Sequence, residues 1–497
     1  MTTPALEKPL TGEEYLESLR DGREVWIGGE KVADVTEHPA FRNATRSVAR
    51  LYDALHDPAN DMLTTDRRGI LTHKFFAPAY SSEDLVDARD ALALWSRMSY
   101  GFMGRSPDYK ASFMAGLGAD PAWYGDFASS AEHWYRKYAE GALFLNHVLI
   151  NPPIDRSKAV HDMEDVFVHV VEERDGGMVV SGAKMLATGS ALTHATFVAQ
   201  NSATQLEKGK AEDYALVFIA PLDTPGQKLL SRRSYEATAD SPFDHPLSSR
   251  FDENDAVIVF DNAFIPWENV LVYRDVEKAT GFYAQSGFLN RYTLQAGTRL
   301  AVKLDFLTGL ISRALETNGT DGFRGVQAEL GELFGWRSLM WSITTALCHD
   351  TRPGPGESVV PNADVAMLVR LFGSMAAPRF NEIAAQILGG SPLLVPSSVE
   401  DMKSAELRPL IDRFYRGSSG SAEERIKLFK LIWDAMGSEF GARHEWYERN
   451  YGGSAELVRL DALRFGTRGG ELAKCQAMVE QCMSDYDLDG WTGDTWT

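Results

Sequence analysis

Cysteines and long apolar runs are scarce in this chain. Among its 497 residues there are only three cysteines, Cys348, Cys475 and Cys482, and no CxxC pair. An odd number of thiols without close pairs argues against a disulfide framework and against a structural metal site, and it fits a reducing compartment. No apolar run is long enough to cross a bilayer, and the N-terminus lacks a basic start followed by an apolar segment. We therefore expect a cytoplasmic protein without a metal centre.

Common nucleotide-binding and hydrolase motifs are also missing. The nearest approach to a dinucleotide fingerprint is Gly116-Leu117-Gly118, which lacks the third glycine and follows a helical pattern rather than a strand. No P-loop, HExxH or GxSxG motif occurs. These absences count against a nicotinamide enzyme, a P-loop nucleotidase, a zinc protease and an α/β-hydrolase.

Positive charge is in short supply as well. The chain carries 70 Asp and Glu residues against 50 Lys and Arg residues, a formal net charge of −20. Such a field repels nucleic acid and anionic membranes, so neither is an expected partner. With 44% hydrophobic residues, the chain can bury a large core divided into roughly two to four domains.

The hydrophobic period changes twice along the chain. Residues 1–143 show helical spacing, as in the segment where Ser82 could cap a helix with Leu85, Ala88, Leu92 and Trp95 facing inward. Residues 144–280 contain runs rich in β-branched and aromatic residues, two of which flank the turn Asp175-Gly176-Gly177. We predict an N-terminal helical domain followed by a β domain.

Helices return in residues 281–497 and become longer. The run RYTLQAGTRLAVKLDFLTGLISRALE contains no proline, and Ser421 with Glu424 forms a capping box before another helix. Long amphipathic helices of this kind build bundles. The order of helical domain, β domain and helical bundle is that of an α+β protein rather than of a doubly wound sheet.

Arg105 and Tyr109 stand at a predicted helix start. Ser106 fits the N-cap position and Pro107 the first helical position. The unpaired N–H groups and the dipole of a helix start would add positive potential to that of the arginine, a setting suited to an oxyanion or a phenolate. The alternative is that Arg105 pairs with a surface carboxylate while Tyr109 packs in the core.

His147 lies in an apolar run at the junction of the helical and β domains, just before Pro152-Pro153. Ligand sites favour such junctions, although a histidine among apolar residues can equally be a hydrogen-bonded core residue. Two further segments have open alternatives. Glycines in residues 181–204 permit close approach of a flat ligand or mark a bulge, and the Gly-Gly turn in residues 441–454 is a ligand contact or an ordinary helix stop.

Several long segments, taken in order, resemble the large oxygenase component of 4-hydroxyphenylacetate 3-monooxygenase and its relatives. The resemblance spans nearly the whole chain. It rests on LTGEEYLESLRDGREVWIGGE, HPAFRN, YGFMGRSPDY, NPPIDRS, GAKMLATGSALTH, SPFDHPLSSRFDENDA, IPWENV and GSEFGARHEWYERNYGG. It implies an acyl-CoA dehydrogenase-like fold with an N-terminal helical domain, a middle β-barrel domain and a C-terminal four-helix bundle. That order matches the one read from periodicity.

The resemblance also implies a site. Its substrate pocket falls on Arg105, Tyr109 and His147, with Asn201 and Ser202 in the loop that would grip the substrate's side chain. Its flavin contacts fall on Pro153, Ile154, Asp155, Arg156, Thr188, Asn450, Tyr451, Gly452 and Gly453. By analogy with the broader fold, Arg324 and Gln327 would hold the pyrophosphate of a neighbouring subunit's flavin in a homotetramer.

The implied activity is ortho-hydroxylation of a phenol with FADH2 and O2 by way of a flavin C4a-hydroperoxide. The phenol would be 4-hydroxyphenylacetate or a tyrosine derivative, free or tethered to a carrier protein. A separate NAD(P)H-dependent flavin reductase, in transient contact, would supply the reduced flavin. His147 would take the phenolic proton, Arg105 would stabilise oxyanion character and Tyr109 would donate a hydrogen bond.

Three alternative functions are compatible with the same fold. An acyl-CoA dehydrogenase is disfavoured by the RSPDY and NPPIDRS motifs, and an iron–sulfur dehydratase by the lack of any cysteine before Cys348. A non-catalytic assembly partner is the third alternative, and the joint presence of Arg105, Tyr109 and His147 argues against it.

Overall fold

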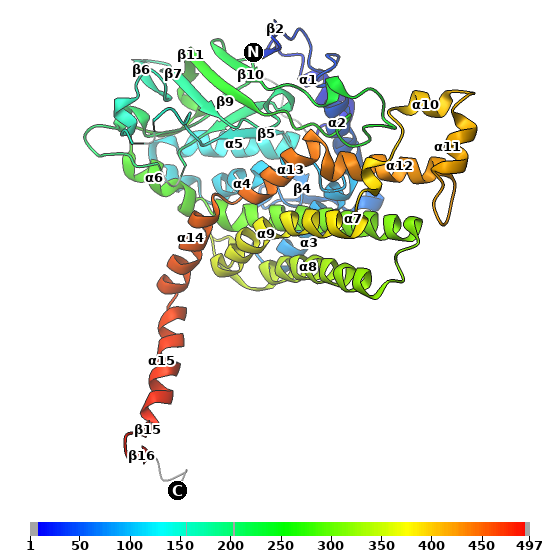
Figure 1. The fold of residues 1–497 in the computed structure, drawn as a ribbon. Coiled ribbons are helices and arrows are strands. Elements are labelled where there is room, and N and C mark those ends of the chain that lie inside the picture. The colour runs from blue at the N-terminus through cyan, green and yellow to red at the C-terminus, as the bar shows by residue number, and fades with distance from the viewer. Residues whose placement is uncertain (1–7, 156, 202–203, 493–497) are drawn as a thin grey trace.

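The computed structural model describes residues 8–155, 157–201 and 204–492. Figure 1 shows two β-sheets lying on one side of the molecule and a layer of long helices on the other, with shorter helices of the N-terminal region between them. Strands and helices follow one another in the predicted order of helical, β and helical regions.

The N-terminal region is mainly helical. Helix α3 shows why: Ser81 and Asp84 form a capping box, and Leu85, Ala88, Leu92 and Trp95 are buried on one face. The predicted inward face is confirmed, while the N-cap is Ser81 rather than Ser82. The helices of this region are α1 (Gly12–Ser18), α2 (Arg42–Leu55), α3 (Ser82–Met98), α4 (Ala111–Ala119) and α5 (Ala128–Gly141).

Short strands also occur in this region, which the helical pattern did not predict. Strand β1 (Glu24–Ile27) pairs in parallel with β10 (Gln227–Ser231), more than two hundred residues away in sequence. Strand β2 (Glu30–Lys31) extends the same sheet, and β3 (Leu63–Thr65) pairs with β4 (Leu71–His73). A four-residue strand is too short to show an alternation that stands out from helical spacing.

The β region forms two open sheets. The larger has the order β2-β1-β10-β11-β7-β6, with β6 at His169–Arg174, β7 at Gly177–Met185 and β11 at Ala256–Pro266. The smaller has the order β12-β9-β8-β5, with β5 at Leu145–Val148, β8 at Ala195–Val198, β9 at Leu216–Pro221 and β12 at Val270–Tyr273. The described residues form no closed barrel, so the barrel expected for this region is replaced by two sheets with edges.

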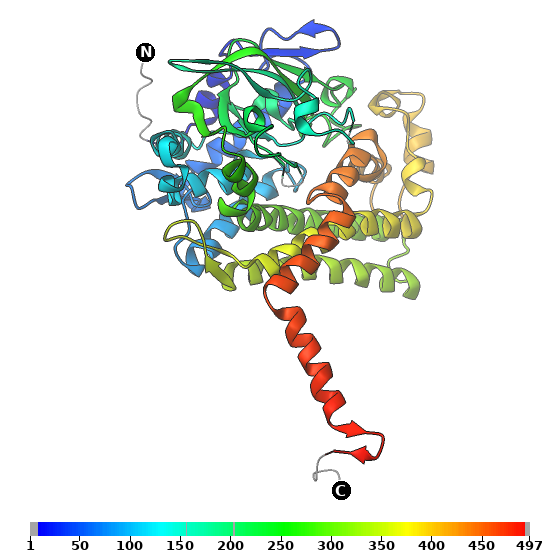
Figure 2. The same cartoon turned by 90° about the vertical axis from the view of Figure 1, so that its left-hand side faces the viewer.

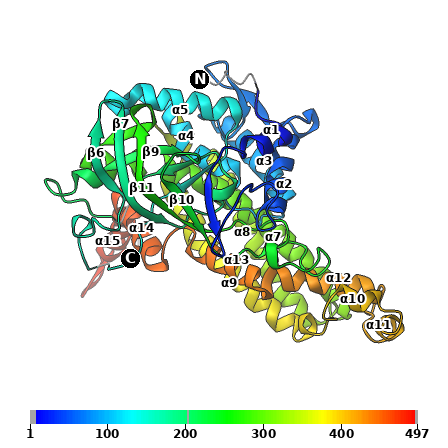
Figure 3. The same cartoon turned by 90° about the horizontal axis from the view of Figure 1, so that it is seen from above.

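The predicted long helices are present in the C-terminal region. Helix α7 (Phe288–Asn318) runs between Gly287 and Gly319, both at positive φ, and packs against α8 (Arg324–His349) and α9 (Ala363–Leu388). Figure 3 shows α10 (Val399–Lys403), α11 (Arg408–Phe414) and α12 (Ala422–Ile432) at one end of this layer. The predicted capping box of Ser421 and Glu424 is confirmed at the start of α12.

Helix α13 (Glu439–Asn450) passes between the sheets and the long helices, and α14 (Ala455–Arg468) packs on α9. Helix α15 (Glu471–Ser484) then leaves the body of the molecule, as both Figure 1 and Figure 2 show, and ends in a hairpin of β15 (Tyr486–Asp487) and β16 (Gly490–Trp491). None of the helices in the described ranges combines the length and hydropathy needed to cross a membrane.

A buried charge cluster fastens α13 to α7. Glu448 accepts hydrogen bonds from Arg299 and from Lys303 Nζ at 3.0 Å, and all three side chains are almost fully buried. Burial acts to raise the pKa of Glu448, but the two cations outweigh it and lower the pKa from 4.5 to about 2. Glu448 therefore stays ionised, and it holds the helix that carries one wall of the site.

We expect Glu448→Gln to lower the free energy of unfolding by about 3–5 kcal/mol at neutral pH, because it leaves two buried cations without their counter-charge. Since the pKa of Glu448 is depressed in the folded state, its contribution is complete above pH about 4.5 and is lost as the pH falls toward about 2. Urea unfolding of the variant and the parent across this range would show their difference shrinking with acid. Glu456→Gln, at an exposed position in α14, is the control, and an equal loss in both variants would contradict the role of the cluster.

Candidate active site

A cavity of about 440 Å³ lies where the three parts of the chain meet. Its wall includes residues from the turn before α4, from strand β5, from the end of β7, and from helices α9 and α13. Aromatic rings contribute much of this wall: Tyr109, Tyr283, Phe288, Tyr292, Trp446, Tyr447 and Tyr451. Such walls exclude water and accept flat ligands.

Arg105 and Tyr109 reach the cavity from a tight turn. Pro107–Lys110 is a 3₁₀ turn with Ser106 at its N-cap, and α4 begins only at Ala111. The Ser106 hydroxyl donates to Asp108 Oδ1 at 2.5 Å instead of capping the turn. The predicted start at Ser106 is therefore confirmed, but as a 3₁₀ turn rather than the mouth of an α-helix.

The Arg105 guanidinium lies among tyrosine rings. Its central carbon is 3.9 Å from the Tyr109 ring centroid and 4.6 Å from that of Tyr451. Its Nη1 is buried and finds no hydrogen-bond acceptor among the described residues. The alternative of a surface ion pair is wrong, because Arg105 is a partly buried cation with donor capacity directed at the cavity.

His147 faces the same space from strand β5, where it lies opposite Phe197 of β8. Its ring stacks on Tyr109 with centroids 5.4 Å apart, and its Nδ1 is buried without a hydrogen-bond partner among the described residues. Burial lowers the pKa of His147 well below 6.5, and the nearby charges of Lys110 and Arg105 lower it further. His147 is therefore a neutral imidazole at physiological pH, not a satisfied core residue.

Lys110 lies behind this wall and was not anticipated from the sequence. It is fully buried, its Nζ has no hydrogen-bond partner among the described residues, and it sits 4.2 Å from the Phe113 ring centroid. Burial lowers the pKa of the Lys110 ammonium well below 10.5, with a smaller contribution from Arg105. Burial among aromatic rings therefore disfavours the charged form of Lys110.

Thr188 follows strand β7 and is held in the cavity wall by backbone hydrogen bonds that continue the pairing of β7 with β11. The backbone N–H of Ala187 donates to Ala256 and that of Gly189 to Asn254, so Thr188 lies across from Asp255. The Thr188 hydroxyl donates to Asp255 Oδ1 at 2.6 Å. Both residues line the cavity.

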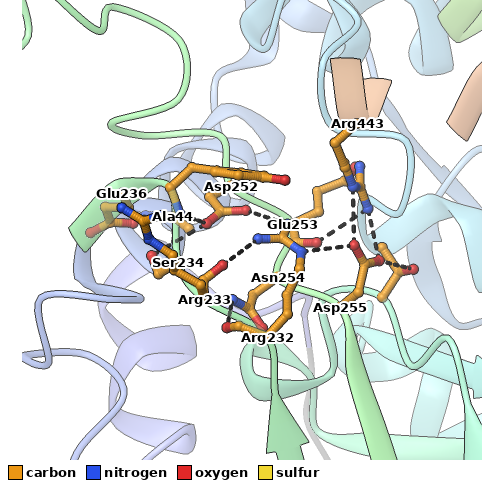
Figure 4. Close-up of polar contacts among 12 residues, drawn as sticks. Ala44, Arg232, Arg233, Ser234, Glu236, Asp252, Glu253, Asn254, Asp255 and Arg443 are labelled. Carbon is orange, nitrogen blue, oxygen red and sulfur yellow. Dashed lines mark hydrogen bonds and ion pairs between the residues drawn. The ribbon is translucent and has the colours of Figure 1, made fainter. Parts of the chain in front are cut away.

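Asp255 is held by two arginines. Arg443 donates to its two oxygens at 2.8 and 3.1 Å, and Arg232 donates to Oδ2 at 3.0 Å. Figure 4 shows Arg443 reaching Asp255 and Glu253, and Arg232 lying between Asp252 and Asp255. Burial acts to raise the pKa of Asp255, but Arg443 and then Arg232 outweigh it and hold the pKa well below its ordinary value.

The turn after α13 forms another part of the wall. Asn450, Tyr451, Gly452 and Gly453 all line the cavity. Arg370 of α9 donates to the Gly452 carbonyl at 2.6 and 3.0 Å, and Gly453 has φ of +108°, which favours glycine. The turn is thus fixed from behind and presents backbone toward the cavity.

Not all predicted site residues reach this cavity. Those that line it are Arg105, Tyr109, His147, Thr188, Asn201 and Asn450 to Gly453. Pro153 and Ile154 are exposed and Asp155 is partly buried, none of them in the wall, although Leu149 and Ile150 just before them do line it. Arg324 and Gln327 are exposed at the start of α8, outside the cavity. Arg156 and Ser202 lie outside the described residues.

Sequence reasoning missed Asp255, Arg370, Arg443 and Tyr447. A signal for two of them was present, because Arg443, Tyr447 and Asn450 follow the spacing of one helix face. Asp255 lies within SPFDHPLSSRFDENDA, one of the segments that carry the family resemblance, but nothing singled it out there. No motif pointed to Arg370. The roles of both residues depend on partners distant in sequence.

Both halves of the chain match models of one family. Residues 11–272 match "4-hydroxyphenylacetate 3-hydroxylase N terminal" and residues 279–480 match "4-hydroxyphenylacetate 3-hydroxylase C terminal". The chain is 56% identical over 98% of its length to the pyoverdin chromophore biosynthetic protein PvcC of Pseudomonas aeruginosa, covering 98% of that protein. It is 51% identical over 98% of its length to a 4-hydroxyphenylacetate 3-monooxygenase oxygenase component of the same organism, covering 94% of it.

A solved structure has the same fold. The oxygenase component of 4-hydroxyphenylacetate 3-monooxygenase, complexed with FAD and 4-hydroxyphenylacetate, superposes with a TM-score of 0.89 at 31% identity, covering 95% of this chain and 99% of that one. The predicted fold class is confirmed by this agreement.

Gly104 has no side chain, and the space beside it in the cavity wall is filled by the ring of Tyr447. A Cβ at Gly104 would lie 2.2 Å from the Tyr447 hydroxyl oxygen and 2.7 Å from its ring carbons. We expect Gly104→Ala to displace this ring from its place beside Arg105 and to lower stability by about 1–3 kcal/mol. Urea unfolding measures the loss. Gly335→Ala is the control because its Cβ would meet nothing within 4 Å on the exposed face of α8. A Gly104→Ala variant as stable as the parent would contradict the crowding.

Proposed function

The chain belongs to the 4-hydroxyphenylacetate 3-hydroxylase family and is the oxygenase component of a flavin-dependent monooxygenase; we propose that it hydroxylates a phenol ortho to the existing hydroxyl group. One observation carries this proposal for the site. An arginine with unused donor capacity, a neutral histidine and a tyrosine converge on one aromatic cavity. A phenol fits this arrangement, because its ring packs against the aromatic wall and its oxygen can contact the arginine, the histidine and the tyrosine.

Arg105 stabilises the phenolate. The guanidinium keeps its charge and lies against the rings of Tyr109 and Tyr451. Its Nη1 has no hydrogen-bond acceptor among the described residues. A donor that is already oriented in a water-poor site stabilises developing negative charge more than it would in water. Tyr109 adds a directional hydroxyl on the same side.

His147 accepts the phenolic proton. An imidazole that is neutral at physiological pH has a lone pair to offer, and burial beside Lys110 and Arg105 keeps His147 in that form. The fixed charge of Arg105 favours the phenolate over the phenol. Proton transfer to His147 thus makes the ring carbon ortho to the oxygen a better nucleophile while the site gains no net charge.

The residues present fit a flavin ring. Thr188 offers a hydroxyl oxygen, and the turn from Asn450 to Gly453 offers backbone without bulky side chains at its glycines. Leu149 and Ile150 supply an apolar surface that a flat ring can cover. Reduced FAD with O2 supplies the electrophilic oxygen when bound, and the aromatic wall keeps water from it.

A separate reductase must deliver the reduced flavin, because the sequence holds no complete nicotinamide motif. We further propose a homotetramer. Helix α15 projects from the body with Met478, Val479 and Met483 exposed, as expected of a segment that packs on another copy. In such an assembly Arg324 and Gln327 would bind the pyrophosphate of a neighbouring subunit's flavin. Pro153, Ile154 and Asp155 would contact the ring of the flavin in their own subunit.

The activity is tested by supplying reduced FAD and air together with para-substituted phenols, free and tethered to a carrier protein. We expect a mass gain of one oxygen atom for at least one of them. Which phenol is hydroxylated depends on how its para substituent fits the loop that begins at Asn201. Bleaching of oxidised flavin by an acyl-CoA, with no oxygenated product, would instead indicate a dehydrogenase.

We expect His147→Ala to lower the rate of hydroxylation on the order of 10²-fold while reduced FAD still binds, because the phenol then keeps its proton. Flavin oxidation would continue and release hydrogen peroxide without product. The measurement is the yield of hydroxylated phenol per flavin oxidised. His133→Ala, at an exposed histidine in α5, is the control, and an unchanged yield in His147→Ala would refute the role.

A further inference from the structure

Lys110 is a buried amine close to the residues proposed to bind the phenol. It ends the Pro107–Lys110 turn, its side chain is fully buried, and its Nζ has no hydrogen-bond partner among the described residues. Burying an amine without a partner costs free energy, because the group gives up its hydrogen bonds to water. Buried ionisable groups of this kind gather at functional sites, so the surroundings of Lys110 are informative.

The Lys110 amine and the His147 imidazole pack against the same two aromatic rings. Lys110 Nζ is 4.7 Å from the Tyr109 ring centroid and 4.2 Å from that of Phe113. The centroid of the His147 ring is 5.4 Å from that of Tyr109 and 6.5 Å from that of Phe113. Among the charges that lower the pKa of His147, that of Lys110 has a larger effect than that of Arg105. The amine is therefore a close neighbour of the imidazole.

The two ring nitrogens of His147 face different surroundings. Nδ1 is buried and has no hydrogen-bond partner among the described residues, while His147 itself lines the cavity. Nε2 is therefore the nitrogen that is left for a ligand. Nδ1 of His147 and Nζ of Lys110 are both buried without a partner beside the same rings, an arrangement in which a proton can pass between them directly or through one water.

His147 alone holds a phenolic proton weakly. A phenol loses its proton at a pKa of about 10 in water, whereas an ordinary imidazole binds one at about 6.5. Burial lowers the pKa of His147 further, so an imidazolium there would return the proton to the phenolate. Burial also lowers the pKa of Lys110, but an amine starts about four units above an imidazole. A phenolate in the cavity would then favour the ammonium as an opposite charge nearby.

We propose that Lys110 is the final acceptor of the phenolic proton and that His147 passes the proton on. The phenol O–H bond breaks as a hydrogen binds to His147 Nε2, and the Nδ1–H bond breaks as a hydrogen binds to Lys110 Nζ. The phenol becomes a phenolate, the imidazole stays neutral with its hydrogen on the other nitrogen, and the amine becomes an ammonium. The transfer needs no further reactant, and its reversal returns the proton to the product.

This inference rests on the proposed function, because it takes the phenol oxygen to lie at His147. Lys110 acts through His147 and does not touch the phenol. Its effect is therefore separable from binding of the ring, which the aromatic wall provides.

The charged and titratable groups around Lys110 leave its amine free to accept. Arg105, Asp108 and Tyr109 lie on the same segment, and His147 faces it from β5. The Asp108 carboxylate accepts hydrogen bonds at its Oδ1 from two other side chains, at 2.5 and 3.2 Å. Burial and then the charge of Arg105 lower the pKa of Lys110. The amine can accept a proton above that pKa and cannot do so below it.

The test uses Lys110→Met, which replaces the amine with an apolar chain of similar length, and two phenols supplied with reduced FAD and air. A para-alkyl phenol is protonated at neutral pH and needs an acceptor, whereas a phenol with a strongly electron-withdrawing para substituent is already ionised. We expect the variant to hydroxylate the first about 10²-fold more slowly than the parent and the second at the parental rate. It should also unfold at a higher urea concentration, because a buried unpartnered amine is gone.

The pH profile gives a second readout. In the parent, hydroxylation of the para-alkyl phenol should fall as the pH drops through the pKa of Lys110, because an ammonium cannot accept the proton. In Lys110→Met the rate should instead rise with the ionisation of the phenol itself, toward a pH of about 10. Lys403→Met, at an exposed lysine in α10, is the control and should match the parent. In a His147→Ala background, Lys110→Met should have no further effect.

Three outcomes would overturn the inference: a parental rate of Lys110→Met on the para-alkyl phenol, an equal loss on both phenols, or an effect that adds in full to that of His147→Ala. If Lys110→Met does not fold, the parent decides the question, since the two phenols should then differ in their acid limb and equal profiles would contradict the relay. A folded parent that hydroxylates no phenol would mean that the proposed function, and not the role of Lys110, has failed.

Discussion

The bidentate pairing of Arg443 with Asp255 joins the parts of the molecule that make the cavity. Asp255 stands just before strand β11, and Arg443 lies on helix α13, almost two hundred residues further along the chain. The same two residues also contact Thr188, which follows β7, and Glu253, whose side chain accepts a hydrogen bond from the backbone N–H of Arg105. Both partners are largely removed from water, so separating them would leave buried charge uncompensated. The placement of the Thr188 side of the cavity relative to the Arg105 side depends on this contact.

The arginines that line the cavity differ in whether their guanidinium groups are paired with acceptors of the protein. Arg443 is paired with Asp255 and Glu253, while Arg370 is held by the Gly452 carbonyl and Asp461. Arg105 alone among these three has a buried guanidinium nitrogen without a described acceptor. The paired arginines therefore build the wall and the unpaired one is available to a ligand. His147 lies in the same cavity with its ring stacked on Tyr109, and burial together with Lys110 and Arg105 lowers its pKa.

Some expectations from the sequence were right for physical reasons that act locally. The inward face of α3 follows from helical spacing, and the start of α12 from a capping box, because both depend on residues a few positions apart. The strand at residues 24–27 was missed because its partner is β10, and the expected barrel proved to be two open sheets because closure depends on how distant edges pair. The turn at Ser106 was placed correctly, but its 3₁₀ form follows from the contact of Ser106 with Asp108.

By itself the sequence determined the order of helical and β regions, the family, and the residues Arg105, Tyr109, His147 and Thr188 as candidates for the site. These depend on local patterns and on motifs that stand in the chain as continuous segments. Only the tertiary structure decided that Asp255 contacts Thr188, that Arg370 fixes the Gly452 turn, that buried Lys110 has no hydrogen-bond partner among the described residues, and that Pro153 and Ile154 lie outside the cavity wall. Each of these depends on burial or on a partner far away in sequence, and neither quantity is a property of the residues next to it in the chain.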